Sequence, residues 1–241
     1  MIIDSHAHIH MPAESFRFMA ELIGGRANPY TLPKIPDASI RKVAEDQIKI
    51  MDSVGTDIQF ISPRPYLQMH SVKPAKVTEL WSRHCNDLIA EFVKLFPDRF
   101  RGVAGLPQYM DESLELRAIP ELRRCVNDLG FVGCLINPDA TEGLGDPPGM
   151  GDPYWHPLYR VMVELDVPGL IHSAGSCSER ESYTLKFLNE ESISVVSLLG
   201  AKTLDAFPGL KIVVAHGGGA IPYQMGRFRS WNVRKGEKES F

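Results

Sequence analysis

Four histidines stand directly at the ends of short apolar segments, where their rings could share a ligand. His6 and His8 follow the first such segment, His172 follows the fifth, and His216 follows the sixth. Residues i and i+2 of a strand point to the same side, so the rings of His6 and His8 can face one metal ion, and neutral imidazole is the commonest metal ligand. The alternatives are a chance His-x-His pair in a polar loop and histidines that are hydrogen-bonded at strand ends for structural reasons. Taken together, the four positions predict a metal site.

Arginines that could bind an anionic substrate lie in two places. Arg64 follows Pro63 at the end of the second apolar segment. A planar guanidinium there can hold a carboxylate by two parallel hydrogen bonds. The alternative is that Arg64 pairs with a structural acid such as Asp139. Arg227 and Arg229 follow the sixth segment, and ordinary surface charge is the alternative for both.

The elements that would position these residues alternate between two patterns. Segments rich in Val, Ile and Leu predict six strands, at Met1–Asp4, Asp57–Ser62, Phe100–Leu106, Val132–Asn137, Pro168–His172 and Leu210–His216. Longer amphipathic segments predict helices at Ile40–Val54, Thr78–Leu95, Ser113–Leu129, Pro157–Leu165 and Phe187–Phe207. This alternation, with few hairpin signals, indicates a parallel sheet with helices outside it. An open doubly wound sheet and a (β/α)₈ barrel both fit, and in both the carboxyl ends of the strands form the ligand-binding face.

Composition narrows the class of protein. The 241 residues are 44% hydrophobic, enough for one core, and we expect a single domain over residues 1–241. The net charge of −4 argues against nucleic acid or an anionic membrane as partner, and no apolar run approaches the ~20 residues of a membrane helix. The four cysteines are scattered and the N-terminus shows no signal peptide, which predicts reduced thiols and a cytoplasmic location.

Several motifs carry a family resemblance. The segments Asp4-Ser5-His6-Ala7-His8, Ile171-His172 and His216-Gly217-Gly218-Gly219 resemble the amidohydrolase superfamily, and within it the branch of aminocarboxymuconate semialdehyde decarboxylase-like proteins. Longer segments, among them Cys85–Ile89 and Leu135–Asp139, resemble the 4-oxalomesaconate hydratases of that branch. The resemblance runs along essentially the whole chain.

The resemblance implies a distorted TIM (β/α)₈-type barrel with one divalent metal ion, usually zinc (Zn²⁺). About six βα units are expected here, without the family's last two units and the acidic residue after its eighth strand. By position, His6, His8 and His172 match the metal ligands and His216 matches a catalytic residue near the substrate. Residues that match or adjoin the substrate-binding positions at the strand ends are Arg64, Asn137, Ser173, Arg227 and Arg229.

The function that follows is a metal-dependent hydratase, a lyase that adds water to an unsaturated keto-polycarboxylate such as 4-oxalomesaconate in the degradation of aromatic compounds. The first alternative is a metal-dependent decarboxylase or hydrolase of the same superfamily, and the second is an impaired, truncated barrel without activity. The expected partner is a small-molecule carboxylate substrate. Open strand edges beside the first and sixth strands predict cover by a partner chain or by rearranged helices, and hence a homo-oligomer.

Overall fold

Six strands form one parallel sheet whose order in space is their order along the chain. The computed structural model describes residues 1–234 except 29, 110, 176 and 178. Its strands are β1 (Ile3–His8), β2 (Ile58–Ser62), β3 (Phe100–Gly105), β4 (Gly133–Ile136), β5 (Gly169–Ile171) and β6 (Ile212–Val214). Each strand pairs in parallel with the next. A doubly wound sheet would reverse its order at a switch point. The unbroken order is that of a barrel wall, so it decides between the two architectures left open by the sequence.

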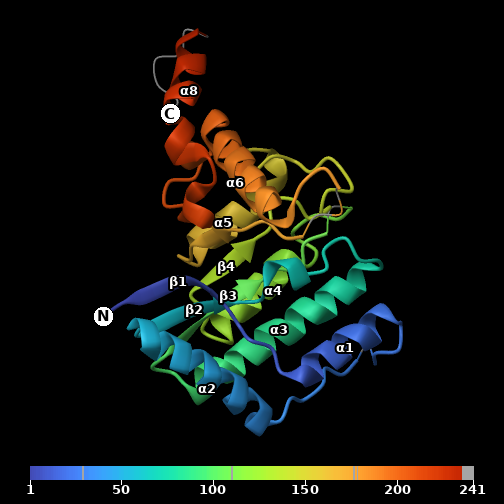
Figure 1. The fold of residues 1–241 in the computed structure, drawn as a ribbon. Helices are drawn as coiled ribbons and strands as arrows, with labels where there is room; N and C mark the ends of the chain where they lie inside the picture. The colour runs from blue at the N-terminus through green and yellow to red at the C-terminus, as the bar shows by residue number, and fades with distance from the viewer. Residues whose placement is uncertain (29, 110, 176, 178, 235–241) are drawn as a thin grey trace.

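Helices connect the strands and cover the outside of the sheet. They are α1 (Ala13–Ile23), α2 (Asp37–Val54), α3 (Ala75–Leu95), α4 (Ala118–Asn127), α5 (His156–Glu164), α6 (Tyr183–Gly200), α7 (Thr203–Ala206) and α8 (Ile221–Arg234), with short 3₁₀ turns η1 (Pro65–Leu67), η2 (Pro153–Trp155) and η3 (His216–Gly218). Figure 1 shows α1, α2 and α3 together on one side of the strands, while α8 projects at the top of the view. Of the described helices, none has both the length and the apolar character that crossing a bilayer requires.

The central strands carry the core. Every residue of β4 and β5 is buried, as expected for parallel strands covered on both faces, whereas β6 is only partly buried. The main hydrophobic cluster joins Phe92 of α3 and Phe100 of β3 to Trp155 of η2 and Tyr159 of α5, all without exposed surface. The hydrophobic core therefore supports the strands from β2 to β5, at whose ends Arg64, Asn137 and His172 lie.

The sequence-predicted elements agree with this arrangement in number and order of strands. They differ at β1, which was expected at Met1–Asp4 and spans Ile3–His8, and at several helix boundaries. Helices α1 and α8 were not predicted. The helix predicted from Phe187 starts earlier, at Tyr183, because the Ser182 hydroxyl caps it by accepting a hydrogen bond from the Leu185 amide at 3.4 Å. The predicted helix also ends before Phe207, because Lys202 adopts a left-handed conformation (φ 53°) and separates α6 from α7.

Candidate metal centre and active site

Strand β1 places two imidazoles on the same rim. His6 and His8 lie within the strand, which pairs with β2 through Ala7 opposite Ile61 and His8 opposite Ser62. The register shifts between Asp4 and Ala7, and this irregularity re-aims the side chains at the end of the strand. The Asp4 carboxylate accepts a hydrogen bond from the His6 amide at 3.1 Å, which fixes the local backbone.

His172, which directly follows β5, lies beside His6 and His8 although β1 and β5 are not neighbours in the sheet. Its amide continues the β4–β5 ladder by donating to the Ile136 carbonyl at 3.0 Å, so its position is set by the main chain. Ligand nitrogens of His6, His8 and His172 all lie within 4.8 Å of one another. Their ring centroids are 4.9–5.2 Å apart, in edge-on arrangements that turn the nitrogens inward.

Hydrogen bonds at Nδ1 orient the imidazole rings of His172 and His8. The Nδ1–H of His172 donates to the Ser173 carbonyl at 2.7 Å, and Nδ1 of His8 lies 2.8 Å from the Ser62 hydroxyl. Such outer partners fix the orientation of a metal-binding imidazole and leave Nε2 for the metal. Burial, reinforced by neighbouring histidines, lowers the pKa of His8 and of His172 to about 3, and burial also lowers the pKa of His6. The rings are therefore neutral, which is the form that binds a metal ion.

His216 stands beside the trio on a different support. Its ring centroid is 4.8 Å from that of His172 and 5.4 Å from that of His6. The residue begins η3 in a left-handed conformation (φ 48°), and the three glycines that follow also have positive φ. Its Nδ1 lies 2.8 Å from Oε1 of Glu191, and its ring stacks on Phe187 with 5.5 Å between centroids. Both partners belong to α6.

A cavity of ≈ 340 Å³ opens beside the rings of His8, His172 and His216. Arg64 and Tyr66 line it on the β2 side, with the Arg64 guanidinium donating to the Tyr66 hydroxyl at 3.4 Å. Tyr183 and Phe187 line it on the α6 side, and Tyr183 meets the rings of Tyr66 and Phe187 edge-on at 6.1 and 4.6 Å. The full lining is His8, Arg64, Pro65, Tyr66, His172, Tyr183, Thr184, Phe187, Leu188 and His216. A cationic group and an aromatic wall thus face the histidines, which suits a flat, anionic molecule.

Asn137 and Ser173 lie at the rim, but their polar groups bond within the protein. The Asn137 amide group donates to Nδ1 of His70 and to the Asp139 carbonyl, both at 2.9 Å, while its oxygen accepts from the Ala174 amide at 3.3 Å. The Ser173 hydroxyl is fully buried and donates to the Ala174 carbonyl at 3.4 Å. Both residues brace the loop that carries His172, and substrate contact by either stays a prediction.

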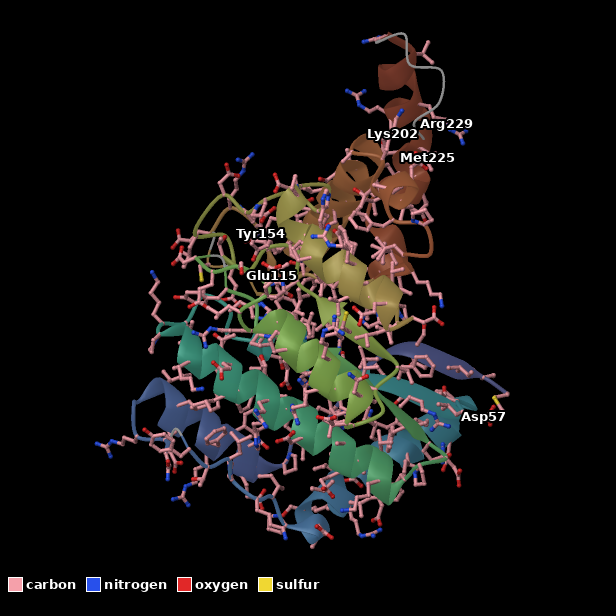
Figure 2. The ribbon with its side chains drawn as sticks, turned by 180° about the vertical axis from the view of Figure 1, so that it is seen from behind. Asp57, Glu115, Tyr154, Lys202, Met225 and Arg229 are labelled. Atoms are coloured by element: carbon pink, nitrogen blue, oxygen red, sulfur yellow. The ribbon has the colours of Figure 1, made fainter. Side chains whose placement is uncertain are left out.

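Arg227 and Arg229 are not brought to this cavity. Both are exposed on α8, outside the residues that line the cavity. Figure 2 shows Arg229 together with Met225 on the projecting part of this helix. Contact of Arg227 and Arg229 with substrate therefore stays a prediction.

Helix α6 supplies the site residues that sequence reasoning missed. Tyr183, Phe187 and Glu191 are spaced four residues apart, so they share one face of the helix. That face turns toward the rim. An aromatic–aromatic–acid series at helical spacing was the available signal, but nothing in it says which neighbour the face meets. Burial raises the pKa of the Glu191 carboxyl, and the hydrogen bond to His216 opposes that shift.

The family model that matches this chain is that of the amidohydrolases, and it matches residues 3–235. The chain belongs to the amidohydrolase family. Among curated relatives of this amidohydrolase is 2-keto-4-carboxy-3-hexenedioate hydratase from Sphingobium sp. (strain NBRC 103272 / SYK-6), which is 40% identical over 95% of this chain and 69% of the relative.

Two solved structures place the fold. 4-Oxalomesaconate hydratase from Rhodopseudomonas palustris superimposes with a TM-score of 0.84 at 33% identity, covering 97% of this chain and 68% of that one. Dihydroxybenzoic acid decarboxylase from Polaromonas sp. JS666, with bound manganese and the inhibitor 2-nitroresorcinol, gives 0.72 at 26% identity, covering 95% and 70%.

These likenesses confirm the family resemblance and the fold class drawn from the sequence. The six parallel strands of this amidohydrolase form a curled half-barrel of the TIM type. The relatives are enzymes, and both predicted reaction types, hydration and decarboxylation, occur among them. A divalent metal ion, manganese, is bound in the decarboxylase structure.

Proposed function

We propose that this amidohydrolase binds one divalent metal ion, with zinc as first choice, through His6, His8 and His172. The proposal holds further that the site adds water to the carbon–carbon double bond of an unsaturated keto-polycarboxylate such as 4-oxalomesaconate. The observation that carries it is the convergence of three neutral imidazoles within 4.8 Å, beside a cavity lined by two of them, His8 and His172, together with His216 and Arg64. The similarity to two hydratases, at 40% and 33% identity, supports the reaction class.

The donor set fits a catalytic metal ion. Three imidazole nitrogens with room for further ligands on the cavity side are typical of catalytic zinc, and imidazole also suits other first-row metals. When bound there, the ion would supply Lewis-acid chemistry, polarising an oxygen and lowering the pKa of water. The fixed Nδ1 contacts of His8 and His172 hold the donor atoms in place before any ion arrives.

The side chains of the chain account for binding and proton transfer. Arg64 binds a substrate carboxylate by two parallel hydrogen bonds. The aromatic wall of Tyr66, Tyr183 and Phe187 packs against the flat conjugated part of the substrate and excludes bulk water. Nε2 of His216, on the ring edge opposite Glu191, takes a proton as the water oxygen bonds to one alkene carbon. It then returns that proton to the neighbouring carbon, so the product contains one added water and His216 regains its starting state.

Decarboxylation of a flat aromatic acid is the second candidate function. Two observations favour it: the aromatic lining of the cavity and the similarity to the dihydroxybenzoic acid decarboxylase. The same histidines would serve, with His216 delivering a proton to the carbon that loses carbon dioxide.

Product analysis on the metal-loaded protein separates these reactions. Protein stripped with a chelator and reloaded with zinc or manganese is given 4-oxalomesaconate or 2,6-dihydroxybenzoate. Hydration removes the absorbance of the conjugated alkene without gas release, whereas decarboxylation releases carbon dioxide. His156→Gln is the matched control, because His156 packs against Phe207 outside the site and the variant should keep both metal and turnover. A protein that holds one equivalent of metal and turns over neither substrate would refute both candidates.

The assembly state also stays a proposal. Within the described residues, β1 and β6 are the edges of the sheet, and we propose that a second copy of the chain covers at least one of them. Light scattering of the purified protein tests this, and a monomer across the micromolar range would exclude it.

A further inference from the structure

Glu191 is a buried carboxylate that contacts His216 through one oxygen and also accepts a hydrogen bond from the Ser173 amide. Its side chain has 0% exposed surface, and Oε1 lies 2.8 Å from Nδ1 of His216, whose side chain is 35% exposed. Among the described residues, Oε2 has no hydrogen-bond partner. Burying a carboxylate with so few partners is costly, so a role confined to packing would be better filled by an apolar residue.

Helix α6 clamps the His216 ring in two directions. Glu191 contacts the edge of the ring in its plane, and Phe187, one helical turn earlier, stacks on its face with an interplanar angle of 13°. One contact on the ring edge and one on the ring face together restrict the turning of the ring. The arrangement resembles the partner groups of His8 and His172, except that both contacts here come from side chains of one helix.

Both sides of this clamp are themselves fixed. Lys186 of α6 forms a buried ion pair with Asp139, in the loop after β4, at 2.8 Å. The η3 loop lies directly on α6, where the Ala220 amide donates to the Ser192 hydroxyl at 2.8 Å. A Cβ at Gly219 would lie only 2.5 Å from the Leu188 carbonyl, so the glycine permits this close approach. The docking of the η3 loop on α6 therefore sets the distance between Glu191 and His216.

We propose that Glu191 is a positioning residue for proton transfer by His216. Its carboxylate accepts the Nδ1–H of His216, fixes that tautomer, and so keeps Nε2 unprotonated on the cavity side. The catalytic consequence rests on the proposed role of His216, whereas the tautomer itself does not. A histidine in the other tautomer would present an N–H where a base is needed and could not accept the proton of water.

The direct test reads the tautomer in the metal-loaded protein by two-bond ¹H–¹⁵N correlation of ¹⁵N-histidine, with His216→Asn to assign the signal. We expect the Nδ1–H form in the parent protein and in Glu191→Gln, whose amide oxygen still accepts the bond. In Glu191→Ala we expect a mixture or the Nε2–H form. Glu190→Gln is the matched control, since Glu190 contacts Lys186 and not His216, and it should retain the parent tautomer.

Kinetics on the same proteins complete the test. Glu191→Ala should lower kcat about 10- to 100-fold with KM within about threefold of the parent and one equivalent of metal retained, while Glu191→Gln falls only a few-fold. A structural role alone would lower stability without this split, and without rescue by glutamine. An unchanged tautomer in Glu191→Ala overturns the proposal, as does unchanged kcat in an active enzyme. If the parent turns over no substrate, the proposed function fails, and the tautomer result still decides the role of Glu191.

Discussion

His172 and His216 have ring centroids only 4.8 Å apart, yet the protein holds them by different means. His172 is buried at the end of β5, its amide in the sheet ladder and its Nδ1–H on a backbone carbonyl. His216 stands in a loop of left-handed residues and depends on the side chains of α6. A main-chain partner cannot be altered by substitution, whereas a side-chain partner can. The comparison separates the half of the site whose metal-binding histidines are placed by β1 and β5, which we call the fixed half, from the half in which His216 depends on side chains of α6, which we call the adjustable half.

Removal of His172 should have the largest effect. We expect His172→Ala to lower metal affinity by at least about 100-fold and to abolish turnover, because one of three ligands is lost. Elemental analysis after dialysis and titration with zinc measure the change. Metal retained at parent affinity would show that His172 is not a ligand, and the site would then not divide into the two halves described above.

Replacement of His216 should separate the halves most clearly. His216→Asn is expected to lower kcat by about 10²- to 10⁴-fold while metal content stays at the parent level, since the residue moves a proton and binds no metal. Metal content and turnover are measured on one preparation. Loss of metal equal to that of a His6→Ala variant would show instead that His216 is a ligand.

Substitution of Arg64 tests how the site binds the substrate carboxylate. The proline residues on both sides restrict the chain and aim its side chain reproducibly into the cavity. Arg64→Lys should raise KM by about 10- to 100-fold, the equivalent of roughly 1.5–3 kcal/mol, because lysine cannot make two parallel hydrogen bonds to a carboxylate. Steady-state kinetics and thermal melts are run together. A lower melting temperature with unchanged KM would mean that Arg64 only supports the fold.

A methyl group at Gly219 should give the smallest effect and the one most specific to the adjustable half. Gly219→Ala places a Cβ 2.5 Å from the Leu188 carbonyl and gives alanine a φ of 63°. We expect a loss of about 1–3 kcal/mol in the free energy of unfolding and a few-fold lower kcat, with metal affinity unchanged. Denaturant unfolding and metal titration measure both. Gly217→Ala is the comparison, because nothing lies within 4 Å of its Cβ, so it carries the left-handed cost alone.

The fixed half was predictable from sequence and the adjustable half was not. His6 and His8 lie in β1 and His172 directly follows β5, and the two-residue period and parallel packing of strands bring side chains at their carboxyl ends to one rim. The pairing of Glu191 with His216 joins residues 25 positions apart through the docking of a loop on a helix. Local patterns contain no record of such docking. Arg227 and Arg229 give another example. The sequence shows that they follow a strand end, but not that they lie on a helix that projects from the barrel wall.

Asn137 shows the limit in another form. The sequence correctly indicates a polar residue at the end of β4, but not whether its amide faces solvent or protein. The answer depends on His70, whose ring accepts one of the amide hydrogens from a loop 67 residues away. Position at a rim is thus a property of the strand, whereas availability to a ligand is a property of everything packed around it.

The buried ion pair between Lys186 and Asp139 has a consequence for how relatives of this chain diverge. The pair ties the helix that holds the His216 partner to the loop after β4, and both side chains are nearly inaccessible, at 4% and 3% exposure. Loss of the Lys186 charge alone would leave the buried Asp139 carboxylate without its cation, and loss of Asp139 would leave Lys186 paired with Glu190 alone. Positions 139 and 186 are therefore expected to covary across homologous sequences, with lineages that replace both sites together. Where the pair is absent, residue 191 is expected to vary as well. Positions 139, 186 and 191 would then be correlated across homologous sequences, although position 139 is far from the other two along the chain.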